Sequence, residues 1–544
     1  MTNRELASIF NKLGKIMELH GENPFKVRSY SSAYNTIRRF GEPLIELDRD
    51  QLLAIKGIGQ NIADKVEELK ETGQLSALQK YIDLTPGGIA QMLEIKGLGA
   101  KKILMIWREM GIESPGELLY ACEENRLIEL KGFGVKTQQS LKEQLIYFLD
   151  GQGKYLYGHV ESEGMELLDL IRTTFPEENT DVIGTFGRKM PIVDAIELLT
   201  EVEIEEINEY LLELEAIEER EGELFYKGTL VLISTPFKGY ETDRWSQLAS
   251  DEFLEEWNKK YPKASINEDE ATIFESQNLQ FIPAESRESA LILEQASNNS
   301  FQLIDFEDIK GVVHNHSTYS DGVNSIKEMA DACIELGYEY LVMSDHSQSA
   351  FYADGLKPDR VYQQMEEIDT LNESYQDFHI YKSIESDILS DGRLDYDEEL
   401  LSKFDIVIAS VHSNLKMDEE KAHMRLLNAI ANPATRILGH PTGRLLLSRP
   451  GYPIDHKLII DACAEYNVAI ELNASPYRLD VDWTWVPYAM ERDVLVAINP
   501  DAHSIAGIKD IRFGVIAARK GGLPPDLCLN TKSRVLFDQW IGSK

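Results

Sequence analysis

The chain has 544 residues, of which 43% are hydrophobic and 27% charged, and its formal net charge is -38. This length exceeds what one hydrophobic core supports, so we expect about three to four domains. The N-terminal segment is charged where a signal peptide is apolar, and no apolar run reaches the roughly 18 residues of a membrane span. Four widely spaced cysteines without a CxxC pair exclude a zinc ribbon and indicate reduced thiols in a cytoplasmic protein.

The acidic charge is unevenly distributed. Residues 1–150 carry 20 basic and 21 acidic side chains, residues 151–309 carry 12 and 36, and residues 310–544 carry 23 and 36. Because binding to nucleic-acid phosphates depends on Lys and Arg, a DNA-binding surface is expected in the first third of the chain. The acidic middle third would repel a polyanion.

Three segments of the first third, residues 53–66, 93–106 and 127–141, repeat a short apolar helix end, a Gly-x-Gly turn and an amphipathic helix. They resemble helix-hairpin-helix motifs. Peptide N–H groups and the positive end of a helix bind backbone phosphate without reading bases, so sequence-nonspecific DNA is the expected partner. A purely structural helical bundle is the alternative. The candidate DNA-binding residues are Gly57, Gly59, Gly97, Gly99, Gly132, Gly134 and Lys65.

Residues 23–40 and the first hairpin resemble the small N-terminal lyase-type domain of X-family DNA polymerases, in which Lys65 matches the Schiff-base lysine. Such chemistry needs a lysine whose pKa is lowered by burial or by nearby cations. The neighbours here are Asp64, Glu67 and Glu68, which favours a solvated helix residue. We therefore expect a lyase-like domain at residues 1–80 without lyase activity, and two further hairpins at residues 81–150.

Residues 182–199 resemble the palm signature of X-family polymerases, in which Gly-Ser, a basic pair and Asp-x-Asp on a strand assemble nucleotide and metal. Alternating carboxylates point the same way and can bridge two cations. Here the aligned pair is Ala195 and Glu197, and Leu232 stands in place of the third carboxylate. Residues 151–309 are thus expected to form a degenerate α+β palm and thumb. An active polymerase that uses Asp194 and Glu197 is the alternative.

From residue 310 the chain alternates short apolar strands with helical segments, which favours a parallel α/β barrel or a doubly wound sheet. In such folds chemistry collects at the C-terminal ends of the strands, and nearly every strand here ends in His, Asp or Glu. Nine of the eleven histidines lie beyond residue 310. Buried imidazoles and carboxylates are costly unless they are paired or bound to metal. The candidate ligands are His314, His316, Asp321, His346, Glu385, His412, His440, Asp501 and His503.

These motifs resemble the PHP (polymerase and histidinol phosphatase) domain, and they cover residues 310–544. The resemblance implies a distorted (β/α)7 barrel with three divalent metal ions. One ion would be held by His314, His316, Glu385 and Asp501, a second by Glu385, His412 and His440, and the third by Asp321, His346 and His503. Imidazole with carboxylate suits Mn, Zn or Fe alike. Glu385 and Asp501 are candidate catalytic residues, and so are Arg444 and Arg449 as phosphate clamps, since guanidinium matches phosphate bidentately. A surface salt bridge is the alternative for each arginine.

The whole chain thus resembles bacterial PolX-type proteins, X-family polymerases fused to a PHP domain, with the palm degraded. This resemblance predicts a metal-dependent phosphoesterase that binds DNA and acts in DNA repair as a 3'-5' exonuclease or 3'-end processor. The enzymatic alternatives are a small-molecule phosphatase of the histidinol phosphatase kind and a polymerase that is still active. A noncatalytic adaptor with structural metals is disfavoured, because structural sites are normally closed and four-coordinate.

Overall fold

The computed structural model describes residues 1–543 apart from 124–126, 128, 129, 131, 151, 152, 221, 267, 298–301, 448 and 449. The chain divides into two compact units, Met1–Gln152 and Gly153–Lys544. Across the described residues, no helix combines the length and the apolar character that crossing a membrane requires.

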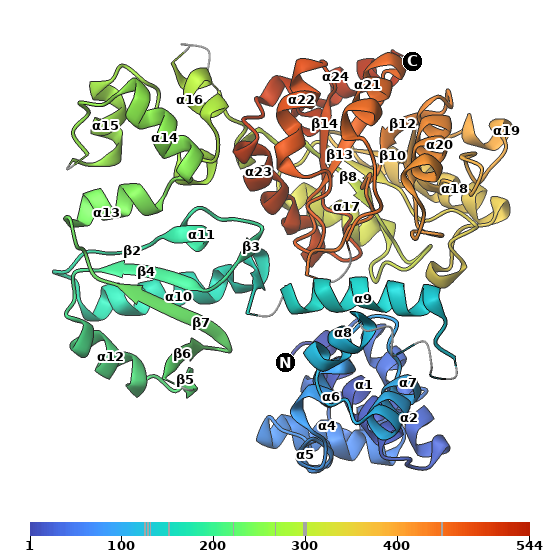
Figure 1. Ribbon diagram of the computed structural model, residues 1–544. Helices are drawn as coiled ribbons and strands as arrows, with labels where there is room; N and C mark the ends of the chain where they lie inside the picture. Colours follow the sequence, from blue (N-terminus) through green and yellow to red (C-terminus); the bar gives the residue numbers. More distant parts are fainter. Residues whose placement is uncertain are drawn as a thin grey trace. The chain divides into compact units, whose positions relative to one another are not determined.

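The described part of the first unit is helical (Figure 1). Left-handed Gly73 and Gly111 end the helices that follow the first two Gly-x-Gly turns. Leu6, Phe10 and Ile103 are completely buried in the core between the helices. The helical N-terminal region expected from the three repeats is confirmed. Its helices are α1 (Asn3–Leu19), α2 (Pro24–Arg38), α3 (Arg49–Ala54), α4 (Gln60–Thr72), α5 (Ser76–Asp83), α6 (Gly87–Met92), α7 (Ala100–Met110), α8 (Pro115–Glu123) and α9 (Val135–Asp150).

The second unit begins with a mixed α+β region, drawn in green in Figure 1. Its five-stranded sheet has the order β2-β4-β7-β6-β5, with β4 and β7 parallel and the other pairs antiparallel. Ile196, Leu198 and Val231 pack with α10 and α12 on one face of the sheet. The strands are β1 (Tyr155–Leu156), β2 (Thr180–Val182), β3 (Ile192–Val193), β4 (Ile196–Thr200), β5 (Ile217–Arg220), β6 (Glu223–Tyr226) and β7 (Thr229–Ser234). The helices are α10 (Tyr157–Thr174), α11 (Gly184–Gly187), α12 (Ile204–Glu213), α13 (Tyr240–Gln247), α14 (Asp251–Lys260), α15 (Glu270–Ser276) and α16 (Ala290–Ala296).

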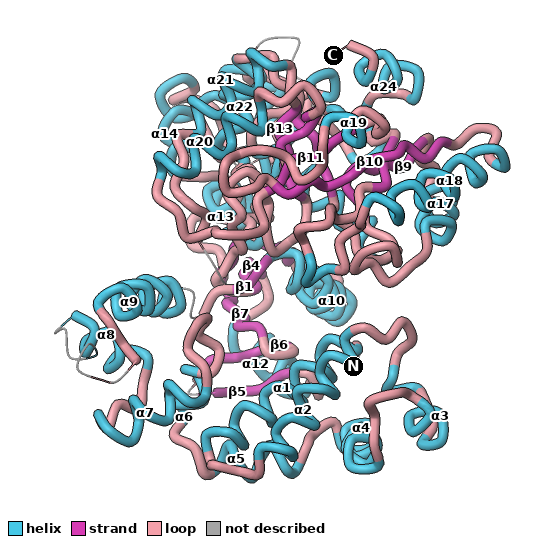
Figure 2. The backbone as a smooth tube through the Cα atoms, turned by 90° about the vertical axis from the view of Figure 1, so that its right-hand side faces the viewer, coloured by secondary structure: helices cyan, strands magenta, loops and turns pink. Residues whose placement is uncertain are grey.

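The rest of the second unit is built on seven described parallel strands that follow one another in sequence order. Figure 2 draws strands of this sheet in magenta. A parallel bridge between Asn315 and Ala502 nearly closes the first and last strands into a barrel. The expected distorted (β/α)7 barrel is confirmed. The strands are β8 (Gly311–Asn315), β9 (Tyr340–Met343), β10 (His379–Asp387), β11 (Ile406–Ser410), β12 (Thr435–Leu438), β13 (Ala469–Asn473) and β14 (Val496–Asn499). The helices are α17 (Ile326–Glu335), α18 (Pro358–Ser374), α19 (Glu398–Leu401), α20 (Glu419–Ile430), α21 (His456–Tyr466), α22 (Val486–Glu491), α23 (Ile511–Lys520) and α24 (Arg534–Ile541).

The barrel interior is apolar and is closed at its N-terminal end. Val313, Val342 and Ile408 fill the inside, and the last helix, α24, places Phe537 beneath them. The Phe537 ring stacks on that of Tyr340, the first residue of β9, at 4.3 Å between centroids. Polar side chains are therefore directed to the opposite end, where the strands terminate.

Candidate metal centre

All nine predicted ligands lie at or just beyond the C-terminal ends of the barrel strands. β8 carries His314, β10 carries Glu385, and the remaining ligands stand in the segments that follow β8, β9, β11, β12 and β14. Eight of them, all but the exposed Asp321, are buried or half-buried side chains of one continuous cluster around Glu385 and Asp501. Residues spread over almost 190 positions are thus brought together by the closure of the barrel.

Glu385 is the centre of one part of this cluster. Its Oε1 lies 3.2 Å from His314 Nε2, 3.1 Å from His412 Nε2 and 3.0 Å from His440 Nε2. Its Oε2 lies 2.8 Å from His346 Nδ1. The carboxylate is completely buried, and both of its oxygens lie close to imidazole nitrogens.

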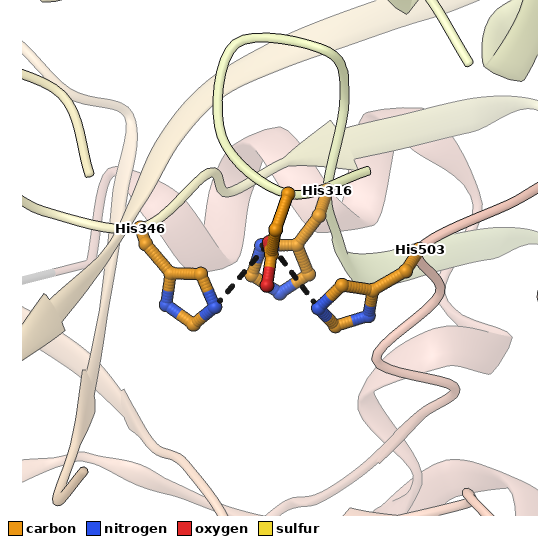
Figure 3. Close-up of side chains that lie close together, drawn as sticks. His316, His346 and His503 are labelled. Atoms are coloured by element: carbon orange, nitrogen blue, oxygen red, sulfur yellow. Dashed lines mark ion pairs between the residues drawn. The ribbon is translucent and has the colours of Figure 1, made fainter. Parts of the chain in front are cut away.

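A second part surrounds His316. Figure 3 shows its ring between those of His346 and His503, with ring centroids 4.4 and 4.2 Å away. Asp321 Oδ1 lies 3.6 Å from His346 Nε2 and 3.4 Å from His503 Nε2. Three strand ends and the loop after β8 therefore converge on one point.

Three sets of residues each have ligand atoms that lie within 4.8 Å of one another inside the set. The sets are His316, Asp321, His346 and His503; His314, His316 and Asp501; and His346, Glu385 and His412. These sets resemble the predicted division among three ions but share His316 and His346 between sets. His440 is outside them, although its Nε2 is close to Glu385. The predicted assignment of each ligand to one ion stays a prediction.

The cluster strongly perturbs the titration of its members. Burial lowers the pKa of His316 to about 4, and the nearby imidazoles of His503 and His346 act in the same direction. Burial also disfavours the charged form of His412, but the carboxylates of Glu385 and Asp387 outweigh it and raise its pKa to about 10. Burial opposes ionisation of Glu385 too, yet the surrounding imidazoles, His412 first, hold its pKa well below the usual range.

The donor set fits divalent cations. Within the described residues, His314 Nε2, His316 Nδ1, Glu385 Oε2 and His440 Nδ1 are buried and have no hydrogen-bond partner. Buried polar atoms are normally satisfied, and each of these can donate an electron pair to a metal. Mixed imidazole and carboxylate ligands bind transition metals. The chain's own residues can therefore hold divalent metal ions here.

Three buried carboxylates that the sequence interpretation missed support the ligands. Glu471 accepts a hydrogen bond from His314 Nδ1 at 2.7 Å, and Asp387 lies 2.5 Å from His412 Nδ1. Asp345 accepts hydrogen bonds from Ser317 and Ser320 in the loop that leads to Asp321. A carboxylate on the second nitrogen of an imidazole fixes the ring's orientation. Their signal in the sequence is an acid inside or next to an apolar strand.

The two predicted phosphate clamps have different outcomes. Arg444 donates through Nε to the carbonyl of Arg478 at 2.9 Å, through Nη1 to Asp482 at 2.7 Å, and through Nη2 to the carbonyl of Leu479. Its donors are directed at the protein, which does not favour the predicted clamp. Arg449 lies outside the described residues.

Arg478 is a cation at the centre that the sequence interpretation missed. Its Nε lies 3.7 Å from Asp501 Oδ2, and its positive charge contributes to lowering the pKa of His440 after burial. No described residue accepts a hydrogen bond from its guanidinium, so its donors are available to an anion. The motif NASPYRLD that contains it has no spacing that would have marked it in advance.

Five of the six hairpin glycines of the first unit, all but Gly57, face open space. Gly97 and Gly132 have φ of +84° and +94°, and no atom lies within 4 Å of a Cβ placed on either one. Backbone conformation, and not packing, therefore requires glycine there. Gly59 and Gly99 begin α4 and α7 without a capping side chain, Gly57 packs against Thr36, and Gly134 precedes α9. Lys65 is half-buried on α4.

The palm-like region ties up the groups that a polymerase would use on nucleotide. Glu197 Oε2 accepts hydrogen bonds from Thr185 N and Oγ1, both at 2.7 Å, and from Phe186 N at 3.1 Å. A Cβ at Gly184 would lie 2.1 Å from Glu197 Oε1. The backbone N–H groups of Thr185 and Phe186 are thus already bonded to this carboxylate. Arg188 is likewise bound, in a 2.6 Å ion pair with the buried Glu288.

The other palm positions have no paired carboxylates. Leu232 lies beside Glu197 in register between β4 and β7, where the resemblance placed a third acid, and it is 48% exposed. Ala195 is completely buried in the break between β3 and β4. Asp194 is directed to solvent, with the Nζ of Lys154 at 4.0 Å.

The sequence profile of the helix-hairpin-helix domain matches residues 1–75, that of the SAM-like helix-hairpin-helix tandem matches residues 89–145, and that of the PHP domain matches residues 313–475. A probable phosphatase of Caldanaerobacter subterraneus is 28% identical over 40% of this chain and 85% of its own. The histidinol phosphate phosphatase of Lactococcus lactis aligns in space with a TM-score of 0.28 and 16% identity, over 39% of this chain and 93% of that chain. Fold and sequence together define a protein that joins DNA-binding hairpins to a metal-dependent phosphoesterase barrel.

The full-length comparison identifies the family. The DNA polymerase/3'-5' exonuclease PolX of Bacillus subtilis is 33% identical over 565 aligned residues, which cover 98% of each chain. The chain therefore belongs to the PolX family, as the motifs of the three thirds predicted.

Proposed function

We propose that this protein is a DNA 3'-5' exonuclease or 3'-end processor of DNA repair whose phosphoesterase centre is the barrel and whose polymerase activity is lost. The observation that carries the proposal is the convergence of nine ligand side chains on one end of the barrel, with Glu385 inside it. The PolX relative supports the choice of DNA 3' ends.

The centre would hold three divalent ions, Mn, Zn or Fe, through the nine side chains named above. When bound, such ions lower the pKa of a coordinated water and neutralise charge on a phosphate. The chain's own contribution is orientation: Glu471 and Asp387 fix the rings of His314 and His412. A fixed ligand frame keeps the reacting groups in place without reorganisation.

Arg478 would bind the phosphate. Guanidinium matches two phosphate oxygens at once, and this guanidinium lies beside Asp501 with its donors available. Arg444 would act indirectly, because it holds the carbonyls of Arg478 and Leu479 and so fixes the loop. The phosphate clamp would then be Arg478, which is neither of the two arginines predicted from the sequence.

The hairpins would bind DNA through backbone phosphate. The glycines at Gly97 and Gly132 leave open space beside the peptide groups, and α7 and α9 begin directly after their turns. Phosphate contacts position a protein on DNA without carrying sequence information. Sequence-nonspecific binding by the first unit follows.

Loss of polymerase activity rests on Glu197. Two-metal transfer needs carboxylates that are open to metal, whereas Glu197 is bonded to the amides of Thr185 and Phe186. Ala195 and Leu232 supply no ligand at the two other positions. We infer that the palm-like region no longer binds nucleotide and metal together.

A second candidate function is hydrolysis of a small phosphate monoester, because the similarity to probable phosphatases covers the barrel alone. Three hairpins have no use in such an enzyme, so DNA is favoured. The two functions are separated by giving the purified protein with Mn²⁺ a 5'-labelled oligonucleotide, its 3'-phosphorylated form and histidinol phosphate. A ladder that shortens from the 3' end, at a rate far above monoester release, is expected. Monoester release without shortening of DNA would show the second function instead.

A further inference from the structure

The first turn of α10 packs directly on the loop that carries Arg478. A Cβ on Gly158 would lie 2.7 Å from Pro476 Cγ and 3.0 Å from Phe513 Cζ, so glycine permits this close approach. The rings of His159 and Tyr477 are in edge contact, with centroids 4.5 Å apart at 69°. Two neighbouring residues of the palm-like region thus contact two neighbouring residues of the barrel loop.

The residue after those two contacts is Arg478. Its N donates to Ser475 O at 2.8 Å, which makes residues 475–478 one tight turn. The carbonyl of Arg478 is held by Arg444, and Tyr477 O accepts from Leu446 N at 2.7 Å. A displacement of Pro476 and Tyr477 therefore moves Arg478 relative to Asp501.

The rest of this contact surface is strongly bonded. Lys520, completely buried on α23, donates to the carbonyls of Arg188 at 2.5 Å and Glu285 at 3.1 Å. Arg512 on the same helix lies 2.5 Å from Glu161 on α10. The palm-like region is thus fixed against the barrel at several points, one of them on α10 itself, as a support for the loop must be.

We infer that the palm-like region, through Gly158 and His159 on α10, is a positioning element that sets Arg478 in the phosphoesterase centre. This inference rests on the proposed function of the barrel. It gives the region a role that needs no nucleotide: α10 contacts the loop, whereas Ala195 and Leu232 stand at two of the positions where the palm signature has carboxylates. Gly158 and His159 are positioning residues, because they would act on Arg478 through Pro476 and Tyr477.

The test uses the full chain and bis(p-nitrophenyl) phosphate, a small diester that does not need the hairpins. His159→Ala should raise KM about three- to tenfold with kcat within about twofold, since coupling between residues in contact has this size. His159→Phe, which keeps a ring against Tyr477, should restore KM. Ser162→Ala, exposed one turn further along α10, is the matched control and should change neither constant. Gly158→Val, which pushes on Pro476 directly, should raise KM at least as much.

A double variant separates positioning from general loss of structure. In an Arg478→Ala background, His159→Ala should have no further effect on KM, and the Kd of inorganic phosphate, measured by calorimetry, should follow the same pattern at unchanged metal content. An equal effect of His159→Ala with and without Arg478 would overturn the inference, as would an unchanged KM in His159→Ala and Gly158→Val. Wild-type protein without diesterase activity would instead contradict the proposed function, and the inference would fall with it.

Discussion

The palm-like region and the barrel each carry a glutamate on a strand, but the two carboxylates have different surroundings. Glu385 has imidazole nitrogens around both oxygens. Glu197 is hydrogen-bonded to the amides of its own chain. An acid is available to a metal only where its neighbours are other ligands, so chemistry is set by what surrounds the acid and not by its presence on a strand.

The same substitution in the two regions should have very different effects on phosphodiester hydrolysis. Glu385→Gln should lower kcat/KM for bis(p-nitrophenyl) phosphate by more than about a thousandfold, because it removes the carboxylate shared by four imidazoles. Glu197→Gln should leave kcat/KM within about twofold. Steady-state rates of both variants at saturating Mn²⁺ measure the effect, and comparable losses in the two would remove the distinction between the regions.

Much of this contrast could be predicted from the sequence. Strand ends of a parallel α/β fold meet at one edge, so the sequence predicts that His314, His412 and Asp501 lie together. What could not be predicted is the direction of individual side chains. Arg444 and Arg478 both stand in loops that follow barrel strands. Only the structure shows that Arg444 holds the loop, whereas Arg478 faces Asp501.

The palm shows the same limit. The absence of acids at Ala195 and Leu232 was readable from the motif, but the bond from Thr185 to Glu197 was not, because it depends on α11 folding back over β4. The buried supports Glu471 and Asp387 were readable in principle, since an acid in an apolar strand needs a partner. They were missed because the motif ligands already accounted for the metals.

Arg478→Ala tests which arginine of the barrel binds the phosphate. Loss of a charge-assisted contact to phosphate should raise KM about 10- to 100-fold while metal content is unchanged. The control is Arg393→Ala, a 78% exposed arginine after β10 that pairs with Asp391. The measurement is the KM of Arg478→Ala for the small diester. A value equal to that of the wild type would show that another residue binds the phosphate.

Replacing the hairpin glycines tests the division of labour between the units. Gly97→Val with Gly99→Val should raise the Kd of a nonspecific duplex about tenfold, since side chains would block the approach of phosphate to the peptide groups. Hydrolysis of the small diester should be unaffected. Fluorescence anisotropy at fixed salt measures the first quantity; undiminished DNA affinity would make this hairpin structural.

The palm-like region should not support templated DNA synthesis. Primer extension with dNTPs and Mn²⁺ should give no product, at enzyme concentrations where the barrel degrades the same primer, because Glu197 is bonded to Thr185 and Phe186. A Glu385→Gln background removes degradation and makes any extension visible. Extension that depends on the template would show that Asp194 and Glu197 still work together.

Metal removal should also lower the thermal stability of the fold. Ions bound at 100 to 1,000 times their Kd stabilise the fold by about 3–4 kcal/mol, which in a domain of this size corresponds to roughly 5–15 °C in Tm. Thermal unfolding before and after chelation, followed by readdition of Mn²⁺, measures it. A Tm that chelation does not change would mean that the ligand cluster is already stable without cations.

The most direct test of the central claim, that the nine side chains form one metal centre for phosphoester hydrolysis, is elemental analysis of the chain with nuclease activity measured on the same sample. Wild-type protein should contain about three equivalents of divalent metal, and His314→Ala should lose metal and 3'-end shortening together. Protein that shortens DNA at the full rate without stoichiometric metal, or with His314 replaced, would contradict the account.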